Sequence, residues 1–352
     1  MNPSFWNGKK ILITGHTGFK GSWLTIWLKK LGAEITGFSK SIPTNPSLFQ
    51  TTNVENGIKS VFGDIRNYEL TKEILEKYKP EIIFHLAAQS LVIKSYSDPI
   101  ETFSTNIMGT VNLLNAVKET KKSKVVVNVT SDKCYENNES LNGYTEDDPM
   151  GGHDPYSSSK GCSELITKSF RNSFFKYNSD NYIGVASVRA GNVLGGGDWA
   201  KNRLIPDIVR AIKNKEKIKI RNPNALRPWQ HVLDPLNGYI QLAEKLWNNQ
   251  TEYAEGWNFG PENNEIKPVL WITEKFDELW KNKIYWIIEN SELHETKNLI
   301  LNCQKAKSKL KWQSKINLEN TLKWTIEWYQ KYFDGEDMRK ITEEQITKFQ
   351  VK

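Results

Sequence analysis

The stretch KILITGHTGFKGSWL, residues 10–24, indicates how this chain folds. Its first residues, Lys10–Thr14, are mostly apolar and predict a short strand, and three glycines spaced Gly-x-x-Gly-x-x-Gly follow at once. Gly15 permits a tight turn, Gly18 lets backbone approach a pyrophosphate, and Gly21 lets the next helix pack close to the strand. The free N–H groups at the start of that helix attract an anion. Strand, glycine spacing and helix together predict a dinucleotide-binding loop.

Outward from this loop, the first half of the chain alternates short apolar runs with amphipathic stretches. This alternation is typical of a parallel sheet with crossover helices, so we expect an α/β, Rossmann-type doubly wound fold. The expected strands are Lys10–Thr14, Glu34–Phe38, Lys59–Phe62, Glu81–Phe84, Lys124–Val129 and Ile183–Val188, and the expected helices cover residues 20–31, 68–79, 98–120 and 154–177.

The chain is longer than one hydrophobic core usually serves. Its 352 residues and 40.6 kDa predict about two domains. Near residue 190 the alternation gives way to loops rich in Gly, Asn and Pro, with short helices at 203–214 and 318–333. We expect a dinucleotide-binding Rossmann domain over 1–189 and a smaller mixed α/β substrate-binding domain over 190–340, with room for the chain to cross back. Residues 341–352 are expected to form a C-terminal tail.

Composition excludes several classes of protein. The mean hydropathy of −0.58, the 25% of charged residues and the lack of a long apolar run exclude a membrane-spanning chain. Nothing resembling a secretory segment precedes the first strand, and Cys134, Cys162 and Cys303 suit neither a disulfide framework nor a zinc site. We therefore expect a reduced, cytoplasmic protein without a metal.

The net charge of +7 and the pI near 9.0 raise the question of nucleic-acid binding. A nucleic-acid footprint is concentrated on one face or in one run, whereas these lysines are scattered along the chain. We expect no nucleic-acid partner. The positive charge suits a small anionic substrate instead.

The end of the second expected strand leaves the identity of the dinucleotide open. An ordinary NAD site has an acid there for the adenosine ribose, but Phe38-Ser39-Lys40 offers none. Lys20 and Lys40 suit the 2′-phosphate of NADP, while NAD held with fewer ribose contacts is the alternative. Asp64, after the third strand, is placed to accept a hydrogen bond from the adenine amine.

Two groups of polar residues suit catalysis. Tyr156 and Lys160 are four residues apart on an expected helix, so the phenol and the ammonium share a face, and a nearby cation favours the phenolate. Ser131, Asp132 and Lys133 follow the fifth strand, at the sheet edge where open α/β folds have their active sites. They offer a hydroxyl, an acid and a base; the simpler alternatives are a surface Tyr–Lys pair and a capped loop.

Four segments resemble the CDP-glucose 4,6-dehydratases of the extended short-chain dehydrogenase/reductase superfamily. They are GHTGFKG (15–21), TSDKCY (130–135), RAGNVLGGGDW (189–199) and RPWQHVLD (227–234). The likeness runs from about residue 5 to residue 333. Related dehydratases have Thr-Asp-Glu or a bare serine after the fifth strand, and Lys133 is a departure that the CDP-glucose group shares.

The resemblance implies NAD as the cofactor and CDP-glucose as the substrate. Tyr156 would take the proton of the 4-hydroxyl, with Lys160 holding the ribose and lowering the tyrosine pKa. Ser131 would bond the 4-oxygen, Asp132 would protonate the leaving 6-hydroxyl, and Lys133 would take the C5 proton. The product would be CDP-4-dehydro-6-deoxyglucose. A 4-epimerase or a reductase of the same superfamily is the alternative function, and a catalytically inactive dinucleotide-binding protein is a third.

The resemblance also implies binding residues and partners. A homodimer is expected through helices 98–120 and 154–177, and a place in the synthesis of O-antigen dideoxysugars for lipopolysaccharide. The expected substrate-binding residues are Gln89, Ser131, Asn192, Arg203 and Arg227. The expected cofactor-binding residues are Gly15, His16, Thr17, Gly18, Phe19, Lys20, Gly21, Asp64, Ile65, Leu86, Ala87, Ala88, Asn106, Val129, Tyr156 and Lys160.

Overall fold

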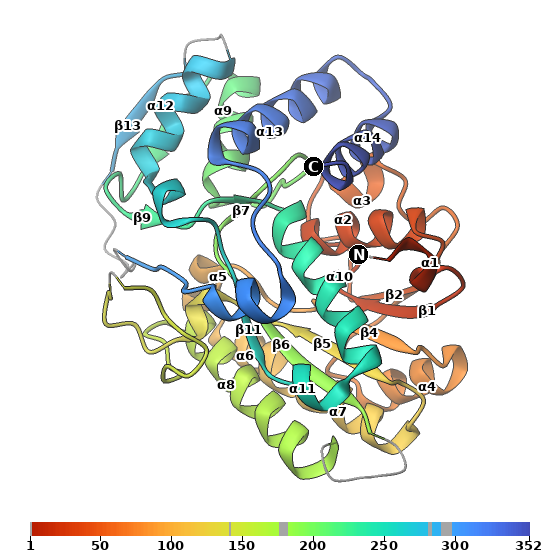
Figure 1. Cartoon of the computed structure of the whole chain (residues 1–352). Coiled ribbons are helices and arrows are strands. Elements are labelled where there is room, and N and C mark those ends of the chain that lie inside the picture. Colours follow the sequence, from red (N-terminus) through yellow and green to blue (C-terminus); the bar gives the residue numbers. More distant parts are fainter. Residues whose placement is uncertain (1, 141, 176–181, 281–283, 290–297) are drawn as a thin grey trace.

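A computed structural model describes residues 2–140, 142–175, 182–280, 284–289 and 298–352. At its centre, seven parallel strands form a sheet in the order β11-β6-β5-β4-β1-β2-β3 (Figure 1). This confirms the predicted α/β Rossmann-type fold, and six of the strands match the expected ones. The bounds are β1 Lys10–Thr14, β2 Glu34–Ser39, β3 Lys59–Phe62, β4 Ile82–His85, β5 Val125–Val129, β6 Gly184–Ala190 and β11 Gly256–Phe259.

Helices cover both faces of this sheet, which is why its central strands are apolar throughout. Val125, Val126 and Val127 of β5 are fully buried, as expected for a strand sandwiched between two helical layers. Helices α4 (Tyr68–Tyr78), α7 (Gly109–Thr120) and α8 (Pro155–Phe170) pack side by side on one face. Helices α2 (Phe19–Lys30) and α10 (Leu233–Asn248) lie together on the other (Figure 1).

Two expected helices are divided by π-helical turns. The stretch 98–120 consists of α6 (Pro99–Phe103), the turn η1 (Ser104–Met108) and α7. The stretch 154–177 consists of α8 followed by the turn η3 (Arg171–Phe175), and residues 176 and 177 lie outside the described residues. None of the described helices is both long and apolar enough to cross a membrane.

The second half of the chain builds a smaller mixed unit at one end of the sheet, where α9, α12 and α13 gather (Figure 1). From this half of the chain, β11 also joins the main sheet, and α10 packs against β5 and β6. A division at residues 189 and 190 stays a prediction. The bounds here are β7 Val193–Leu194, α9 Leu204–Asn214, β8 Ile218–Ile220, β9 Leu226–Arg227, β10 Gln230–His231, α11 Gln250–Tyr253, η4 Asn263–Glu265, β12 Lys267–Pro268, α12 Val269–Trp280, β13 Trp286–Ile288, η5 Ala306–Leu310 and α13 Leu318–Phe333.

The C-terminal residues are packed rather than extended as a tail. Residues 341–350 belong to helix α14 (Met338–Gln350), which contacts α2 and α13. The Phe349 ring lies 5.5 Å from the Trp27 ring, and Trp328 Nε1 donates a hydrogen bond to Thr342 Oγ1 at 3.0 Å. The apolar side chains of α14 recur at helical spacing, so the helix gains stability only against this surface.

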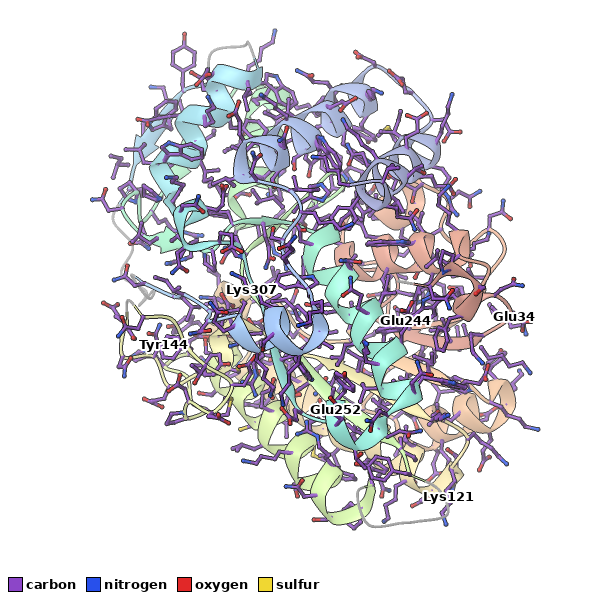
Figure 2. All side chains as sticks on the ribbon, viewed as in Figure 1. Glu34, Lys121, Tyr144, Glu244, Glu252 and Lys307 are labelled. Atoms are coloured by element: carbon purple, nitrogen blue, oxygen red, sulfur yellow. The ribbon has the colours of Figure 1, made fainter. Side chains whose placement is uncertain are left out.

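The N-terminus is fixed in a similar way. Glu244, labelled in Figure 2 on helix α10, accepts a hydrogen bond of 2.6 Å from Trp6 Nε1. Trp6 ends the short helix α1 (Pro3–Trp6), and its ring is fully buried. This contact joins the first turn of the chain to the helix that covers β5 and β6.

Candidate active site

The glycine loop lies where the strand order of the sheet reverses, between β1 and β4. Gly15 has a φ of +76°, and a Cβ there would come within 2.8 Å of the Ala87 amide nitrogen. A Cβ on Gly21 would overlap the Gly15 carbonyl. Gly18 precedes helix α2 without a side-chain cap, so its first N–H groups are available to an anion. The loop therefore fits a pyrophosphate, as predicted.

The side chains inside this loop fix its shape. His16 Nδ1 is 2.8 Å from Ser39 Oγ, and its Nε2 is 2.7 Å from Ser60 Oγ. Burial lowers the pKa of His16 to about 4, so the ring is neutral. Thr17 Oγ1 donates to the Ser41 carbonyl oxygen at 2.7 Å. These contacts attach the loop to the segments that carry β2 and β3.

Lys20 and Lys40 were considered together as a site for the 2′-phosphate of NADP. In the structure they lie among different charged groups. Burial lowers the pKa of Lys20 to about 8, and the charges that act on it include Arg203 and Asp132, at the catalytic end of the cleft. Lys40 instead pairs with Asp64. The two ammonium groups therefore do not converge on one phosphate.

The expected catalytic residues come together at the carboxyl end of β5. Ser131 and Asp132 begin the short 3₁₀ helix η2 (Asp132–Cys134), which packs against the start of α8, where Tyr156 lies. Asp154 caps α8 by accepting the Ser157 N–H at 3.0 Å. The side chains of Ser131, Asp132, Tyr156 and Lys160 are each less than one-tenth exposed.

Hydrogen bonds order this cluster. Ser131 Oγ donates to Asp132 Oδ1 at 2.9 Å, and Lys160 Nζ donates to the Val129 carbonyl oxygen at 3.3 Å. Asp132 Oδ2 is buried and has no hydrogen-bond partner among the residues that the structure describes. An orphaned carboxyl oxygen is costly inside a protein unless it serves a ligand or keeps a proton.

Burial governs the protonation of the cluster. It raises the pKa of Tyr156 to about 12, although the Ser131 hydroxyl and the Arg203 charge lower it. This direction is opposite to the one expected from Lys160, because losing water outweighs a nearby cation. Burial also lowers the pKa of Lys160 to about 8 and raises that of Asp132, against the attraction of Lys133. Burial thus disfavours the charged form of Tyr156, Lys160 and Asp132 alike.

Two arginines of the smaller unit reach the same cleft. Arg203 donates to Asp198 Oδ2 at 3.0 Å and to Ser90 Oγ at 3.1 Å, and its charge acts on Tyr156. The buried Arg227 donates to the Leu226 carbonyl oxygen at 2.9 Å, and its charge acts on Asp132. The two arginines thus bring positive charge to the expected catalytic groups, which suits an anionic substrate.

Comparisons with known proteins agree with this geometry. The sequence profile of the GDP-mannose 4,6-dehydratase family matches residues 12–325. The chain is 49% identical to the CDP-glucose 4,6-dehydratase of Salmonella typhimurium, over 99% of this chain and 98% of that one. The chain belongs to the GDP-mannose 4,6-dehydratase family.

The chain is also similar to more distant proteins in sequence and in fold. Its sequence is 26% identical to that of the dTDP-glucose 4,6-dehydratase of Haemophilus influenzae, over 91% of this chain and 97% of the other. The structure of the Bacillus anthracis dTDP-glucose 4,6-dehydratase in complex with NAD superposes with a TM-score of 0.77 at 24% identity, over 93% of this chain and 98% of that one. The Thermotoga maritima UDP-glucose 4-epimerase with UDP-glucose gives a TM-score of 0.80 at 21% identity, over 92% and 99% of the two chains.

Other predicted residues of this family member support the site from a distance. Gln89 Nε2 donates to the Leu91 carbonyl oxygen at 3.1 Å and to Thr102 Oγ1 of α6 at 2.9 Å, so its amide joins its loop to that helix. Asn106 accepts the Gln89 N–H and donates to Ser159 Oγ at 2.8 Å, which ties the loop after β4 to α8. Asn192 follows β6 half-buried, with its carbonyl oxygen accepting the Gln230 N–H at 3.1 Å.

The remaining predicted positions are backbone neighbours of the loops. Leu86 and Ala87 donate their N–H groups to Thr14 Oγ1 at 3.2 and 3.1 Å, which holds the turn after β4 against β1. Ile65 is buried against Gly109 at the start of α7. Ala88 and Phe19 are half-buried beside these loops.

A buried ion pair behind the catalytic lysine is absent from the sequence predictions for this family member. Glu164, one turn beyond Lys160, accepts from Arg189 Nη2 at 2.8 Å and from Ser187 Oγ at 2.6 Å, and also bonds Thr130. Burial alone would raise the pKa of Glu164, but the Arg189 charge and these bonds outweigh it and lower the pKa. The spacing of four residues between Lys160 and Glu164 could have indicated a residue on the same face of α8. The partner of Glu164, however, is Arg189 on strand β6, which the sequence alone does not place beside it.

We expect Glu164→Gln to lower the free energy of unfolding by about 3 kcal/mol, because it leaves the Arg189 charge buried without its partner. The control is Glu343→Gln, which removes the partner of Arg339 in a more exposed pair and should cost less than about 1 kcal/mol. Urea denaturation of the two variants measures both values. Equal losses would contradict a structural role for the buried pair.

Proposed function

We propose that this family member is a CDP-glucose 4,6-dehydratase. This hydro-lyase converts CDP-D-glucose to CDP-4-dehydro-6-deoxy-D-glucose and water. The observation that carries the proposal is the buried cluster of Ser131, Asp132, Tyr156 and Lys160, with Lys133 beside it. CDP-glucose as the substrate is supported by the Salmonella relative, whose likeness covers nearly the whole chain.

The cofactor site suits NAD. The glycine loop forms a cradle that a Cβ would fill at Gly15 or Gly21, and the uncapped start of α2 offers N–H groups to the pyrophosphate. Asp64 would meet the adenine and Lys160 the nicotinamide ribose. When bound, NAD supplies the acceptor for the hydride from C4 and the donor that returns it to C6.

Tyr156 handles the first proton. Its oxygen takes the proton of the 4-hydroxyl, and Ser131 bonds the same substrate oxygen. Burial raises the pKa of this phenol to about 12, whereas the Ser131 hydroxyl and the Arg203 charge act in the opposite direction and would favour the phenolate that takes the proton. The surrounding burial makes the Arg203 charge more effective than it would be in water.

Asp132 and Lys133 carry out the elimination. Once C4 is a ketone, its neighbour C5–H is acidic, and the Lys133 amine would take that proton. The C5 electrons form the C5–C6 double bond as the 6-hydroxyl leaves with the Asp132 proton, which gives water. Burial raises the pKa of Asp132, which favours the protonated carboxyl that this step needs. Its unpartnered Oδ2 is free to donate the proton.

The smaller unit grips the nucleotide part of the substrate. Arg227 would bind the diphosphate, since a guanidinium suits a phosphate pair. Arg203 would do so from the start of α9, held in place by Asp198 and Ser90. Asn192 adds an amide beside them.

One experiment tests this function against its main alternative. A 4-epimerase of the same fold has no use for an acid and a base beside the hydride acceptor, and its product has the mass of its substrate. Purified protein with NAD should convert CDP-glucose to a product lighter by one water, at a rate well above that for dTDP-, GDP- or UDP-glucose. A product of unchanged mass would favour the epimerase.

We also propose a homodimer formed through α6, η1 and α8. Ile100, Met108 and Leu165 on these elements are 81%, 47% and 56% exposed, which indicates an apolar surface suited to a second copy. A monomer mass in solution would contradict this. A cytoplasmic location, expected from the composition and the cysteines, and a role in O-antigen dideoxysugar synthesis, implied by the resemblance, are proposed with it.

A further inference from the structure

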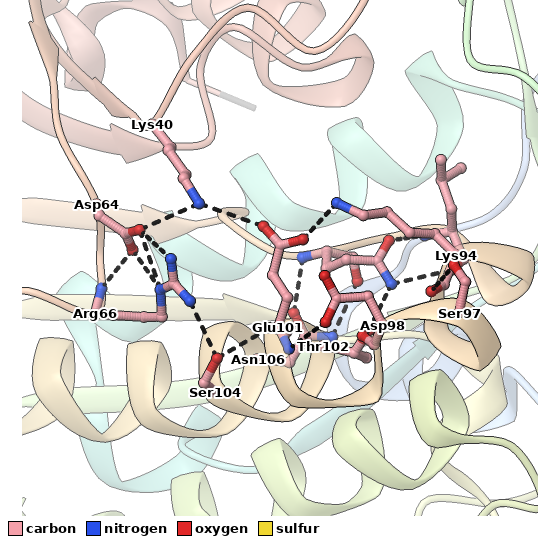
Figure 3. A network of polar contacts seen from close by, with 12 residues as sticks. Lys40, Asp64, Arg66, Lys94, Ser97, Asp98, Glu101, Thr102, Ser104 and Asn106 are labelled. Atoms are coloured by element: carbon pink, nitrogen blue, oxygen red, sulfur yellow. Dashed lines mark hydrogen bonds and ion pairs between the residues drawn. The ribbon is translucent and has the colours of Figure 1, made fainter.

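A network of charged side chains lies beyond the glycine loop, on the side of β2 and β3. Lys40 is the first residue after β2, and its Nζ is 3.4 Å from Asp64 Oδ2 and 3.3 Å from Glu101 Oε1 (Figure 3). Glu101 comes from helix α6, and its other oxygen pairs with Lys94 Nζ at 2.5 Å. One carboxylate thus holds two lysines.

Asp64 also forms an ion pair with Arg66. Arg66 grips it as a fork, with Nε 3.0 Å from Oδ1 and Nη2 2.6 Å from Oδ2. The hydrogen bond from Arg66 lowers the pKa of Asp64 to about 2. Because the charge of Asp64 is largely balanced by Arg66, Glu101 is the carboxylate that chiefly neutralises Lys40.

In Rossmann folds the residue at the end of the second strand meets the adenosine ribose. An acid there bonds the 2′-hydroxyl of NAD, whereas a basic residue attracts the 2′-phosphate of NADP. In this chain the residue at that position is Lys40, and its ammonium group is paired with the carboxylates of Asp64 and Glu101. These ion pairs join three cations to two carboxylates, so removing Glu101 raises their net charge from +1 to +2, leaves Lys40 with Asp64 alone and takes from Lys94 its partner in the pair.

We propose that Glu101 is the residue that makes this protein prefer NAD to NADP, by holding Lys40 and adding negative charge beside the 2′ position of the ribose. The inference rests on the proposed dinucleotide site. In an ordinary NAD site, an acid at the end of β2 has this role. Here the acid would be Glu101, which belongs to helix α6.

The test is calorimetric titration of the purified full-length protein with NAD⁺ and with NADP⁺, without sugar nucleotide. In the wild type, NAD⁺ should bind at least about tenfold more tightly than NADP⁺. Glu101→Gln should tighten NADP⁺ by about tenfold and leave NAD⁺ within threefold, because one unit charge near a dianionic phosphate has an effect of this size. About 0.5 M salt should reduce the gain.

Matched variants separate the network from general effects. Glu119→Gln removes the partner of Lys72 in a similar surface pair at 2.9 Å and should leave both affinities unchanged. Adding Lys40→Met to Glu101→Gln should abolish most of the gain for NADP⁺. Lys40→Met alone should weaken NADP⁺ further and leave NAD⁺ within threefold.

The possible failures are distinct. If neither dinucleotide binds the wild type, the proposed cofactor site is wrong and this inference falls with it. If NAD⁺ binds but Glu101→Gln keeps the wild-type ratio of affinities, the site stands and the role of Glu101 is overturned. Equal wild-type affinity for the two dinucleotides would also overturn it, because Lys40 would then be available to a phosphate.

Discussion

Replacing Tyr156 by phenylalanine is expected to lower turnover of CDP-glucose by about 100- to 10,000-fold, the usual cost of losing a positioned general base. The ring is 8% exposed in a packed setting, so phenylalanine keeps the shape and removes only the oxygen. Substrate affinity should change by less than threefold, because Arg203 and Arg227 hold the nucleotide part. Steady-state kinetics with a direct binding measurement separate the two effects.

The control is Tyr78→Phe, which removes a phenol at the end of helix α4, away from the cleft. It should leave turnover within twofold of the wild type. A Tyr156→Phe enzyme that keeps turnover within threefold would contradict the role assigned to Tyr156, whatever the control shows.

The second large effect separates oxidation at C4 from the elimination that follows. Lys133→Met keeps much of the length of the side chain but loses the amine that would take the C5 proton. Asp132→Asn keeps the size and loses the acidic proton for the 6-hydroxyl. Each variant should form product about 100- to 10,000-fold more slowly than the wild type, since each removes one proton-transfer group.

Exchange of C5–H with deuterated water distinguishes the two residues. Asp132→Asn should retain this exchange, because the base is intact and C4 can still be oxidised. Lys133→Met should suppress it. The reverse pattern would make Asp132 the base and Lys133 the acid. If both variants dehydrate the substrate as fast as the wild type, residues 131–133 have a structural role only. The substrate deuterium content is read by mass spectrometry.

Several features of this molecule follow from neighbouring residues, and the sequence predicted them correctly. The strand and glycine spacing of residues 10–24 produce the observed loop, because a tight turn and a close helix depend on local backbone freedom. Tyr156 and Lys160 share a face because helical geometry places residues four apart together. Asp154 and Pro155 start that helix at the expected point.

Other features depend on residues that only folding brings together. The seventh strand β11 lies beyond the strand–helix alternation of the first half of the chain, and it joins the sheet by pairing with β6. The residues expected as a tail belong to the packed helix α14, because its apolar side requires α2 and α13 to cover it. The pKa of Tyr156 was expected to fall and instead rises, since burial is a property of the whole fold.

The sequence by itself therefore determined six strands of the sheet and the glycine loop, and it proposed the catalytic groups, because periodicity, turn chemistry and helical spacing act over a few residues. The tertiary structure decided which charges those groups meet. Lys40 is 61 residues from Glu101 and Glu164 is 25 from Arg189, and nothing local pairs them. Such contacts arise when crossover helices pack against strands, where distance and burial together fix the energy of each charge.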